Sequence, residues 1–232
     1  MVVTDPPTPP ACTGETEGEL REKLAASFLS APPLDRQDDE QKRRHKAALR
    51  RLLRLENRSI LQAAGLPRPL SQGDLAVLLR ALLDACLQTL GAARQRDSAV
   101  PLMSVQIAEG FPLREAAGFE PRLVQAGVVG LLRAACRANA ADLVAVSLSA
   151  GTEAFILTVT GERPPAEAEA LAVAEETARL HKGGLAVCSG TVGLSLSTSL
   201  PGDAGLYVAP TPTQLLRDTL SAVQVGLYSS LG

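Results

Sequence analysis

Apolar side chains recur every three or four residues in the first third of the chain, a spacing that places them on one face of an α-helix. The pattern predicts a short helix over residues 15–30 and a long helix over 36–64. A turn with adjacent prolines separates them, so we expect an antiparallel hairpin over residues 15–65. A single hairpin buries little apolar surface, whereas hairpins from two chains can form a four-helix bundle. The sequence therefore predicts a homodimer through the hairpin.

The next part of the chain combines the most regular helical pattern, over residues 71–95, with short stretches of alternating apolar and polar residues that are typical of β-strands. Ser71, with Asp74 three residues later, is the expected N-cap of this helix. Further helices are predicted over 120–138 and 166–181, and strands over 102–108, 142–150, 153–161, 185–190 and 192–201. Three helices and five strands predict a two-layer α/β sandwich over residues 66–201, with the helices on one face of a mixed sheet.

Composition restricts the core and the possible sites. Hydrophobic residues make up 46% of the chain and aromatic residues only 3%, so the core must consist mainly of Leu, Val and Ala. The cysteines form no CxxC or CxxH pair, so no metal site is expected; they are Cys12, Cys86, Cys136 and Cys188. No apolar run is long enough to predict a membrane-spanning helix. Unpaired cysteines fit a reducing, cytoplasmic location.

The two ends of the chain differ from the middle. Residues 1–14 are rich in Pro and Thr and are predicted to form a disordered tail. Residues 202–232 form a C-terminal extension whose pattern is first helix-like and then strand-like, and which we assign to no element. The net charge of −2 neither favours nor excludes a polyanionic partner.

Six segments resemble, in order and in spacing, characteristic parts of one family. They are GELREKL (18–24), ALRRLLRLENRS (48–59), PLSQGDLAVLLRALLDA (69–85), GLLRAACR (130–137), ILTVTGE (156–162) and ALAVAEETARLHKGGLAVCSG (170–190). The first two are similar to the dimerisation hairpin of sensor histidine kinases, and the others to the ATP-binding domain. The compact soluble-core kinases of Gram-positive bacteria are the most similar. The resemblance implies an α+β fold, with a helical hairpin followed by a GHKL-type sandwich, and a place in bacterial two-component signal transduction.

The residues that carry this family's chemistry are replaced. Gly18 stands where the family has its phosphoacceptor histidine, and glycine supplies no nucleophile. Ala134 stands in place of the magnesium-binding Asn, and Thr160 in place of the adenine-binding Asp. Only eight positions lead from Thr160 to Ala168, too few for the family's lid. We therefore expect no catalytic residue and no ATP or metal cofactor. The predicted role is that of a pseudokinase, a dimeric scaffold or regulator that binds a response regulator or a partner histidine kinase.

The two histidines allow one alternative. His45 could serve a phosphorelay phosphotransferase. Because Lys46 follows it where a carboxylate would be needed, we favour an exposed helix side chain without catalytic role. His181 is expected to be structural, at a helix end where a cation suits the helix dipole. Gly183 and Gly184 are expected to cap that helix.

A basic stretch allows a second alternative. Residues 42–58 carry eight Lys or Arg against one acid, Glu56. The candidate interaction surface consists of Lys42, Arg43, Arg44, Lys46, Arg50, Arg51 and Arg54. Such a helix could make the protein a nucleic-acid-binding dimer. No aromatic residue interleaves with the cations, so base stacking is not supported and nucleic acid is not the expected partner. We favour a solvated face that pairs with the acids of the preceding helix and with a second group of acids, Asp35, Asp38, Asp39 and Glu40.

Overall fold

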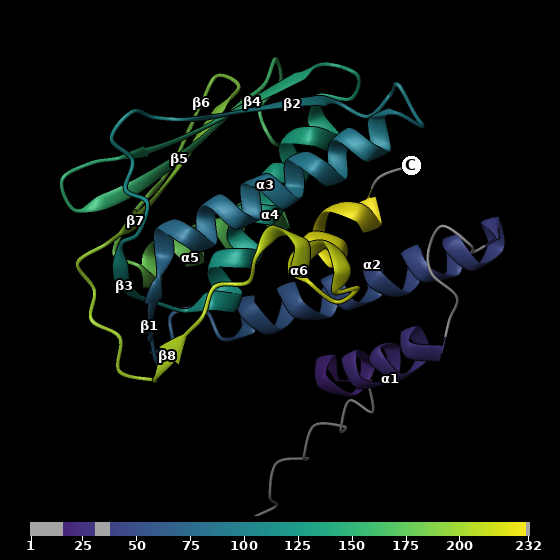
Figure 1. Cartoon of the computed structure of the whole chain (residues 1–232), viewed down its shortest axis with the longest axis horizontal. Coiled ribbons are helices and arrows are strands. Elements are labelled where there is room, and N and C mark those ends of the chain that lie inside the picture. The colour runs from purple at the N-terminus through teal and green to yellow at the C-terminus, as the bar shows by residue number, and fades with distance from the viewer. Residues whose placement is uncertain (1–15, 31–37, 231–232) are drawn as a thin grey trace, which may run out of the picture.

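The computed structural model describes residues 16–30 and 38–230 (Figure 1). The predicted tail over residues 1–14 lies outside the described residues. The helices are α1 (Glu17–Ser30), α2 (Asp39–Gln62), α3 (Leu75–Arg94), α4 (Pro121–Ala138), α5 (Ala168–Leu180) and α6 (Pro212–Arg217). The strands are β1 (Ser71–Asp74), β2 (Leu102–Ile107), β3 (Ala116–Phe119), β4 (Leu143–Ala150), β5 (Ala154–Thr160), β6 (Leu185–Cys188), β7 (Thr191–Ser197) and β8 (Leu206–Tyr207). A π-helical segment (Val223–Leu227) and a 3-10 turn (Tyr228–Ser230) follow α6.

A five-stranded mixed sheet forms one layer of the molecule, in the order β2-β4-β5-β7-β6. β2 and β4 are parallel, and the other neighbours are antiparallel. Alternate residues face the helices, as in the buried row in which Leu157 pairs with Leu148 on one side and Leu194 on the other. α3, α4 and α5 cover this face of the sheet (Figure 1). The predicted sandwich of three helices on five strands is thereby confirmed.

A second, smaller sheet with the order β3-β1-β8 was not predicted. Its strands are two to four residues long, too short for an alternating pattern to stand out in the sequence. Because β1 includes Ser71, α3 begins after it, and the predicted cap at Ser71 is wrong. Asp74 is the N-cap: its carboxylate accepts the N–H of Val77 at 3.0 Å. The same oxygen accepts the N–H of Glu115 at 3.1 Å, so one side chain both starts α3 and fixes the approach to β3.

α3 is the central helix of the core. Although no membrane-spanning helix was expected, α3 is long and apolar enough to cross a membrane by length and composition. In this structure most of its apolar residues are buried against the sheet and the neighbouring helices. Cys86 of α3 and Cys136 of α4 are both buried in this core, and burial raises the pKa of the Cys136 thiol to about 12. Both thiols therefore behave as small apolar core groups.

α1 and α2 form the predicted hairpin, and their apolar face is covered from within the chain. α2 begins at a capping box in which the Asp38 carboxylate accepts the N–H of Gln41 at 2.7 Å. One buried cluster joins the two helices to the end of the chain: Leu20, Leu24, Leu49, Leu52 and Val225. The face from which a four-helix bundle was predicted is thus filled by the chain's own end.

Residues 212–230, which we call the C-terminal segment, lie between the hairpin and the sandwich (Figure 1). α6 packs on α3, and the π-helical segment contacts α2, α3 and α4. A Cβ built on Gly226 would lie only 2.6 Å from Cγ1 of Val129, so glycine permits the backbone to approach α4 closely. The extension that the sequence left unassigned is therefore a wedge between the two parts of the molecule.

Candidate functional site

The three positions that distinguish this chain from a kinase have different surroundings. Gly18 is on the exposed surface of α1, with nothing within 4 Å of a Cβ built on it. Thr160 is exposed at the end of β5, and its hydroxyl lies 3.2 Å from that of Thr191 on β7. Ala134, on α4, is only 2% exposed. The position of the metal ligand is therefore buried in protein.

Direct packing of α4 on α5 buries Ala134. A Cβ on Gly127 would lie 3.0 Å from Cβ of Thr177, and one on Gly130 would lie 3.7 Å from Cβ of Ala170. Ala134 is one turn beyond Gly130 on the same side of α4. Small residues on this side let the two helix backbones approach closely. The resemblance places a metal ion and phosphates beside Ala134, where the structure has helix-on-helix contact.

The short connection between β5 and α5, residues 161–167, is fixed to the end of α4. Asn139 is fully buried there: its Nδ2 donates to the carbonyl of Arg163 at 2.9 Å, and its Oδ1 accepts the N–H of Arg163 at 2.7 Å. A Cβ on Gly161 would lie 2.3 Å from Nδ2 of Asn139, so only glycine fits at that point. The segment that stands in place of the family's lid is thus held against the end of α4.

An ion pair joins α4 to the same connection. Arg133 is 1% exposed, and its Nε and Nη2 donate to the two carboxylate oxygens of Glu167 at 3.1 and 3.0 Å. Arg137, more exposed, lies 3.7 Å from the same carboxylate. Bidentate pairs of this kind fix geometry as well as adding energy. Neither Arg133 nor Glu167 was predicted as a site residue, although an arginine inside an otherwise apolar helix pattern signals a buried charge that needs a partner.

His181 holds the opposite end of the α4–α5 pair. Its Nε2 accepts the N–H of Glu120 at 3.0 Å, and its Nδ1 lies 2.7 Å from the carbonyl of Thr177. A ring that accepts at one nitrogen is neutral, and burial lowers its pKa, so the expected cation is wrong. The glycine cap is correct in part: the N–H of Gly183 donates to the carbonyl of Ala178 at 2.8 Å and closes the helix, but the left-handed φ of 49° belongs to Lys182. A Cβ on Gly183 would lie 1.8 Å from a β7 carbonyl oxygen.

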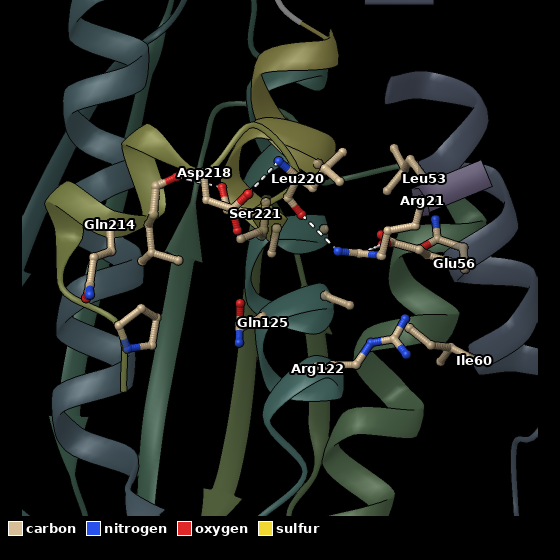
Figure 2. Close-up of a pocket in the computed structure, with 18 of the residues that line it drawn as sticks. Arg21, Leu53, Glu56, Ile60, Arg122, Gln125, Gln214, Asp218, Leu220 and Ser221 are labelled. Atoms are coloured by element: carbon tan, nitrogen blue, oxygen red, sulfur yellow. Dashed lines mark hydrogen bonds and ion pairs between the residues drawn. The ribbon is translucent and has the colours of Figure 1, made fainter. Parts of the chain in front are cut away.

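A cavity of about 600 Å³ lies on another side of α4, between α4, the hairpin and the C-terminal segment (Figure 2). None of Gly18, Ala134 and Thr160 lines it. Its polar lining comes from the hairpin (Arg21, Glu56 and Asn57), from α4 (Arg122, Gln125 and Arg133) and from the C-terminal part of the chain (Tyr207, Gln214, Asp218 and Ser221). No part of the sequence pattern predicted this cavity, because the C-terminal segment that closes it was unassigned.

Most charged groups around this cavity are paired. Arg21 forms an ion pair with Glu56 and donates to the carbonyl of Leu220 at 3.3 Å (Figure 2). Burial raises the pKa of the Glu56 carboxyl, and Arg21 opposes this shift. Arg122 pairs with Glu17 of α1. The expected pairing of the basic helix with the acids of α1 is thus replaced, at these residues, by α1 pairing with Glu56 and with α4.

His45 is buried, at 6% exposure, so the expectation of an exposed side chain is wrong. Its ring packs edge-on against Tyr228, with 6.3 Å between centroids, and burial lowers its pKa. A phosphoacceptor must be open to a phosphate donor, and His45 lies beneath the C-terminal segment. Nothing in this arrangement favours the phosphotransferase alternative.

The candidate basic surface is partly engaged by the same segment. Nε of Arg50 donates to the carbonyl of Ser229 at 2.6 Å, and Nζ of Lys46 lies 5.3 Å from the ring centroid of Tyr228. Arg44 pairs with Glu40 one turn earlier. Arg43 and Arg54 are exposed and remain candidates for contact with a partner.

Comparison with known proteins rests on structure. No protein-family model and no curated protein matches the sequence. The histidine kinase AdeS of Acinetobacter baumannii is similar in structure at 14% identity and a TM-score of 0.51, over 78% of this chain and 93% of that one. The cytoplasmic segment of the histidine kinase QseC is similar over 67% of this chain and 95% of that one, at 16% identity and a TM-score of 0.44. A histidine kinase from Burkholderia phymatum STM815 is similar over 78% of this chain and 88% of that one, at 17% identity and a TM-score of 0.41. The chain therefore has the fold of a sensor histidine kinase core.

Proposed function

We propose that this protein is a pseudokinase: a cytoplasmic regulator or scaffold of two-component signalling that keeps the kinase fold and neither binds ATP nor phosphorylates itself. The observation that carries the proposal is the closed contact between α4 and α5. It buries Ala134 at 2% exposure and is fastened by the Arg133–Glu167 pair. A metal-bound triphosphate needs ligands and space on this side of α4, and small side chains occupy that space.

The partner surface in this proposal is the hairpin, with a response regulator or a partner histidine kinase as the binding protein. Exposed cations of α2, such as Arg43 and Arg54, supply charge for an acidic partner face. The region over residues 15–65 would act as the docking module and residues 66–201 as its support.

Dimerisation through the hairpin needs a further condition. Among the described residues 16–27 and 38–62, no large hydrophobic side chain is exposed, since the C-terminal segment covers the apolar face. We therefore propose that hairpin dimers form only when this segment leaves α2. Sedimentation of the full chain should give a monomer, and Val225→Asp, which expels the segment, should shift it toward a dimer. A full chain that is already a tight dimer would contradict this condition.

The loss of ATP binding is tested by restoring residues. Calorimetry with Mg-ATP should show no binding tighter than about 1 mM for the full chain. The variant Gly18→His/Ala134→Asn/Thr160→Asp should remain equally inactive in binding and autophosphorylation, because the short connection and the α4–α5 contact are unchanged. An active histidine kinase core is the positive control. Micromolar ATP binding by the unmodified chain would overturn the proposal.

A further inference from the structure

The cavity between α4, the hairpin and the C-terminal segment has the size of a small-molecule site. Its volume of about 600 Å³ falls in the usual range of ligand pockets. The hairpin and α4 build two walls, and residues 207–226 build the rest. Apolar side chains from all sides line much of it, among them Leu53, Ile60, Val129 and Leu215. Gln125 extends from the side of α4 away from the hairpin (Figure 2), and its Nε2 donates to the hydroxyl of Tyr207 at 3.0 Å.

Three side chains that line this cavity carry a buried donor without a partner among the described residues. One donor is Nε of Arg21, and the other two belong to side chains that are almost fully buried. Asn57 of α2 is 4% exposed, and its Nδ2 makes no hydrogen bond; Arg133 of α4 is 1% exposed, and its Nη1 makes none. Buried polar groups in native proteins are nearly always paired, because leaving one unpaired forfeits its hydration. Both atoms belong to side chains that line the cavity, on opposite walls. Their common partner would be a molecule inside it.

The unpaired donors determine which hydrogen-bonding groups the ligand must carry. These unpaired atoms are N–H groups, so the ligand must present acceptors. The guanidinium of Arg133 suits a carboxylate, because Glu167 occupies the edge formed by Nε and Nη2 and leaves the N–H groups of the edge formed by Nη1 and Nη2 for a second acceptor. Nδ2 of Asn57 would donate to a second oxygen of the ligand.

The charges around the cavity limit the ligand to low charge. Glu167, Glu56 and Glu17 already pair the three arginines of the lining, and Asp218 adds a further acid. No arginine of the lining is an uncompensated cation, so any anion here must share one with its present partner. Desolvation of the second charge makes a phosphate dianion costlier than a monocarboxylate, whose single charge can share Arg133 with Glu167. The apolar walls instead favour a hydrophobic body.

We propose that this cavity is a binding site for a small monocarboxylate with an apolar body, held by Arg133 at its carboxylate and by Asn57 at a second oxygen. The site uses the C-terminal segment as a wall, so its ligand would stabilise that segment between α2 and α4. The proposal does not depend on the absence of ATP binding.

The test uses the full chain and decanoate as the probe, with 8-anilinonaphthalene-1-sulfonate as a fluorescent reporter that decanoate displaces. We expect decanoate to bind at tens of micromolar, on the order of tenfold or more tighter than decanol and than decyl phosphate. Asn57→Asp, which removes the donor and adds a repelling charge, should weaken decanoate at least about tenfold. Gln62→Glu is the matched control, since it adds the same charge to an exposed position of α2.

A second variant distinguishes a loss of binding from a failure of Asn57→Asp to fold. Ala126→Phe fills the cavity from the α4 wall without touching either donor, and should abolish displacement while circular dichroism stays native. Equal binding by Asn57→Asp, Ala126→Phe and the unmodified chain would place decanoate elsewhere and overturn the proposal. Absence of binding below 1 mM, or tighter binding of decyl phosphate, would overturn it as well.

Discussion

Two sides of one helix have become opposite environments in this protein. Toward α5, α4 presents Gly127 and Ala134, and a Cβ built on Gly127 would collide with Thr177. Gly130 lies at the boundary, since a Cβ there would touch Ala170 and the residue also lines the cavity. Toward the hairpin and the C-terminal segment, α4 presents Arg122, Gln125 and Val129, and a cavity of about 600 Å³ remains. The first side is where the resemblance places a nucleotide, and the second has no counterpart in that resemblance.

The difference shows how one helix can lose a nucleotide site on one side and border a new cavity on another. On the α5 side, small residues and a short connection bring backbones together, and Arg133 and Asn139 fasten them with directional hydrogen bonds. On the hairpin side, the C-terminal segment lies between the hairpin and α4, and the cavity remains between these three parts of the chain. Loss of the nucleotide site is thus a matter of packing as well as of missing ligands.

The largest expected effect comes from breaking the wedge. Val225→Asp places a carboxylate in the buried cluster with Leu49 and Leu52, which should lower the free energy of unfolding by about 4 kcal/mol. Val208→Asp is the control, because Val208 is exposed and should cost less than about 0.5 kcal/mol. Urea unfolding measures both. Similar costs would mean that the segment is not packed as described.

The next largest effect concerns the closed side. Arg133→Met keeps the length of the side chain and removes the bidentate pair, so we expect a loss of about 2–3 kcal/mol in urea unfolding. This is less than for a fully buried pair because Glu167 is partly exposed. Arg137→Met removes the exposed partner of the same carboxylate and should cost less than about 0.5 kcal/mol. Equal losses would show that the pair does not fasten the connection.

A smaller effect should appear with pH. His181 joins the α4 and α5 ends as a neutral ring, and its pKa is lowered from an ordinary 6.5, first by burial. A histidine with a lowered folded pKa stabilises the fold above its unfolded pKa, and this stability is lost as the pH falls. The free energy of unfolding should therefore decrease below about pH 6.5, by at most about 1.4 kcal/mol per pH unit for each such histidine.

Variants of the two histidines distinguish how much each one contributes to this pH dependence. His45 of the hairpin has a pKa lowered by burial as well, so it should contribute to the same decline. His181→Gln and His45→Gln should each reduce the slope of stability against pH between pH 7.5 and 5.5. A slope unchanged in both variants would show that neither ring is held neutral by its surroundings.

Much of the fold could be predicted from the sequence, because its elements are long and periodic. The heptad-like leucines of α3 and the alternation in β4 and β5 mark buried faces directly. The small sheet was missed, since β1 and β8 are too short to show a period. The C-terminal segment was unassigned because its π-helical and 3-10 turns follow neither helical nor strand periodicity.

The site was less predictable than the fold. Missing ligands such as Ala134 could be found by resemblance alone. The residues that close the site, Arg133 and Glu167, are 34 positions apart, and no local pattern announces such a pair. Asn57 lies within the basic stretch, which suggested a solvated face. Its burial depends on the C-terminal segment, and thus on a contact between distant parts of the chain.

One measurement compares both sides of α4 in a single sample. The chain contains only two asparagines, Asn139 on the closed side and Asn57 at the cavity. Selective ¹⁵N-asparagine labelling therefore gives two side-chain amide signals, which Asn57→Asp assigns. We predict that Mg-ATP at 1 mM moves neither signal, and that decanoate moves the Asn57 signal alone. A shift of the Asn139 signal on addition of Mg-ATP would contradict the closed nucleotide site, which is the central claim.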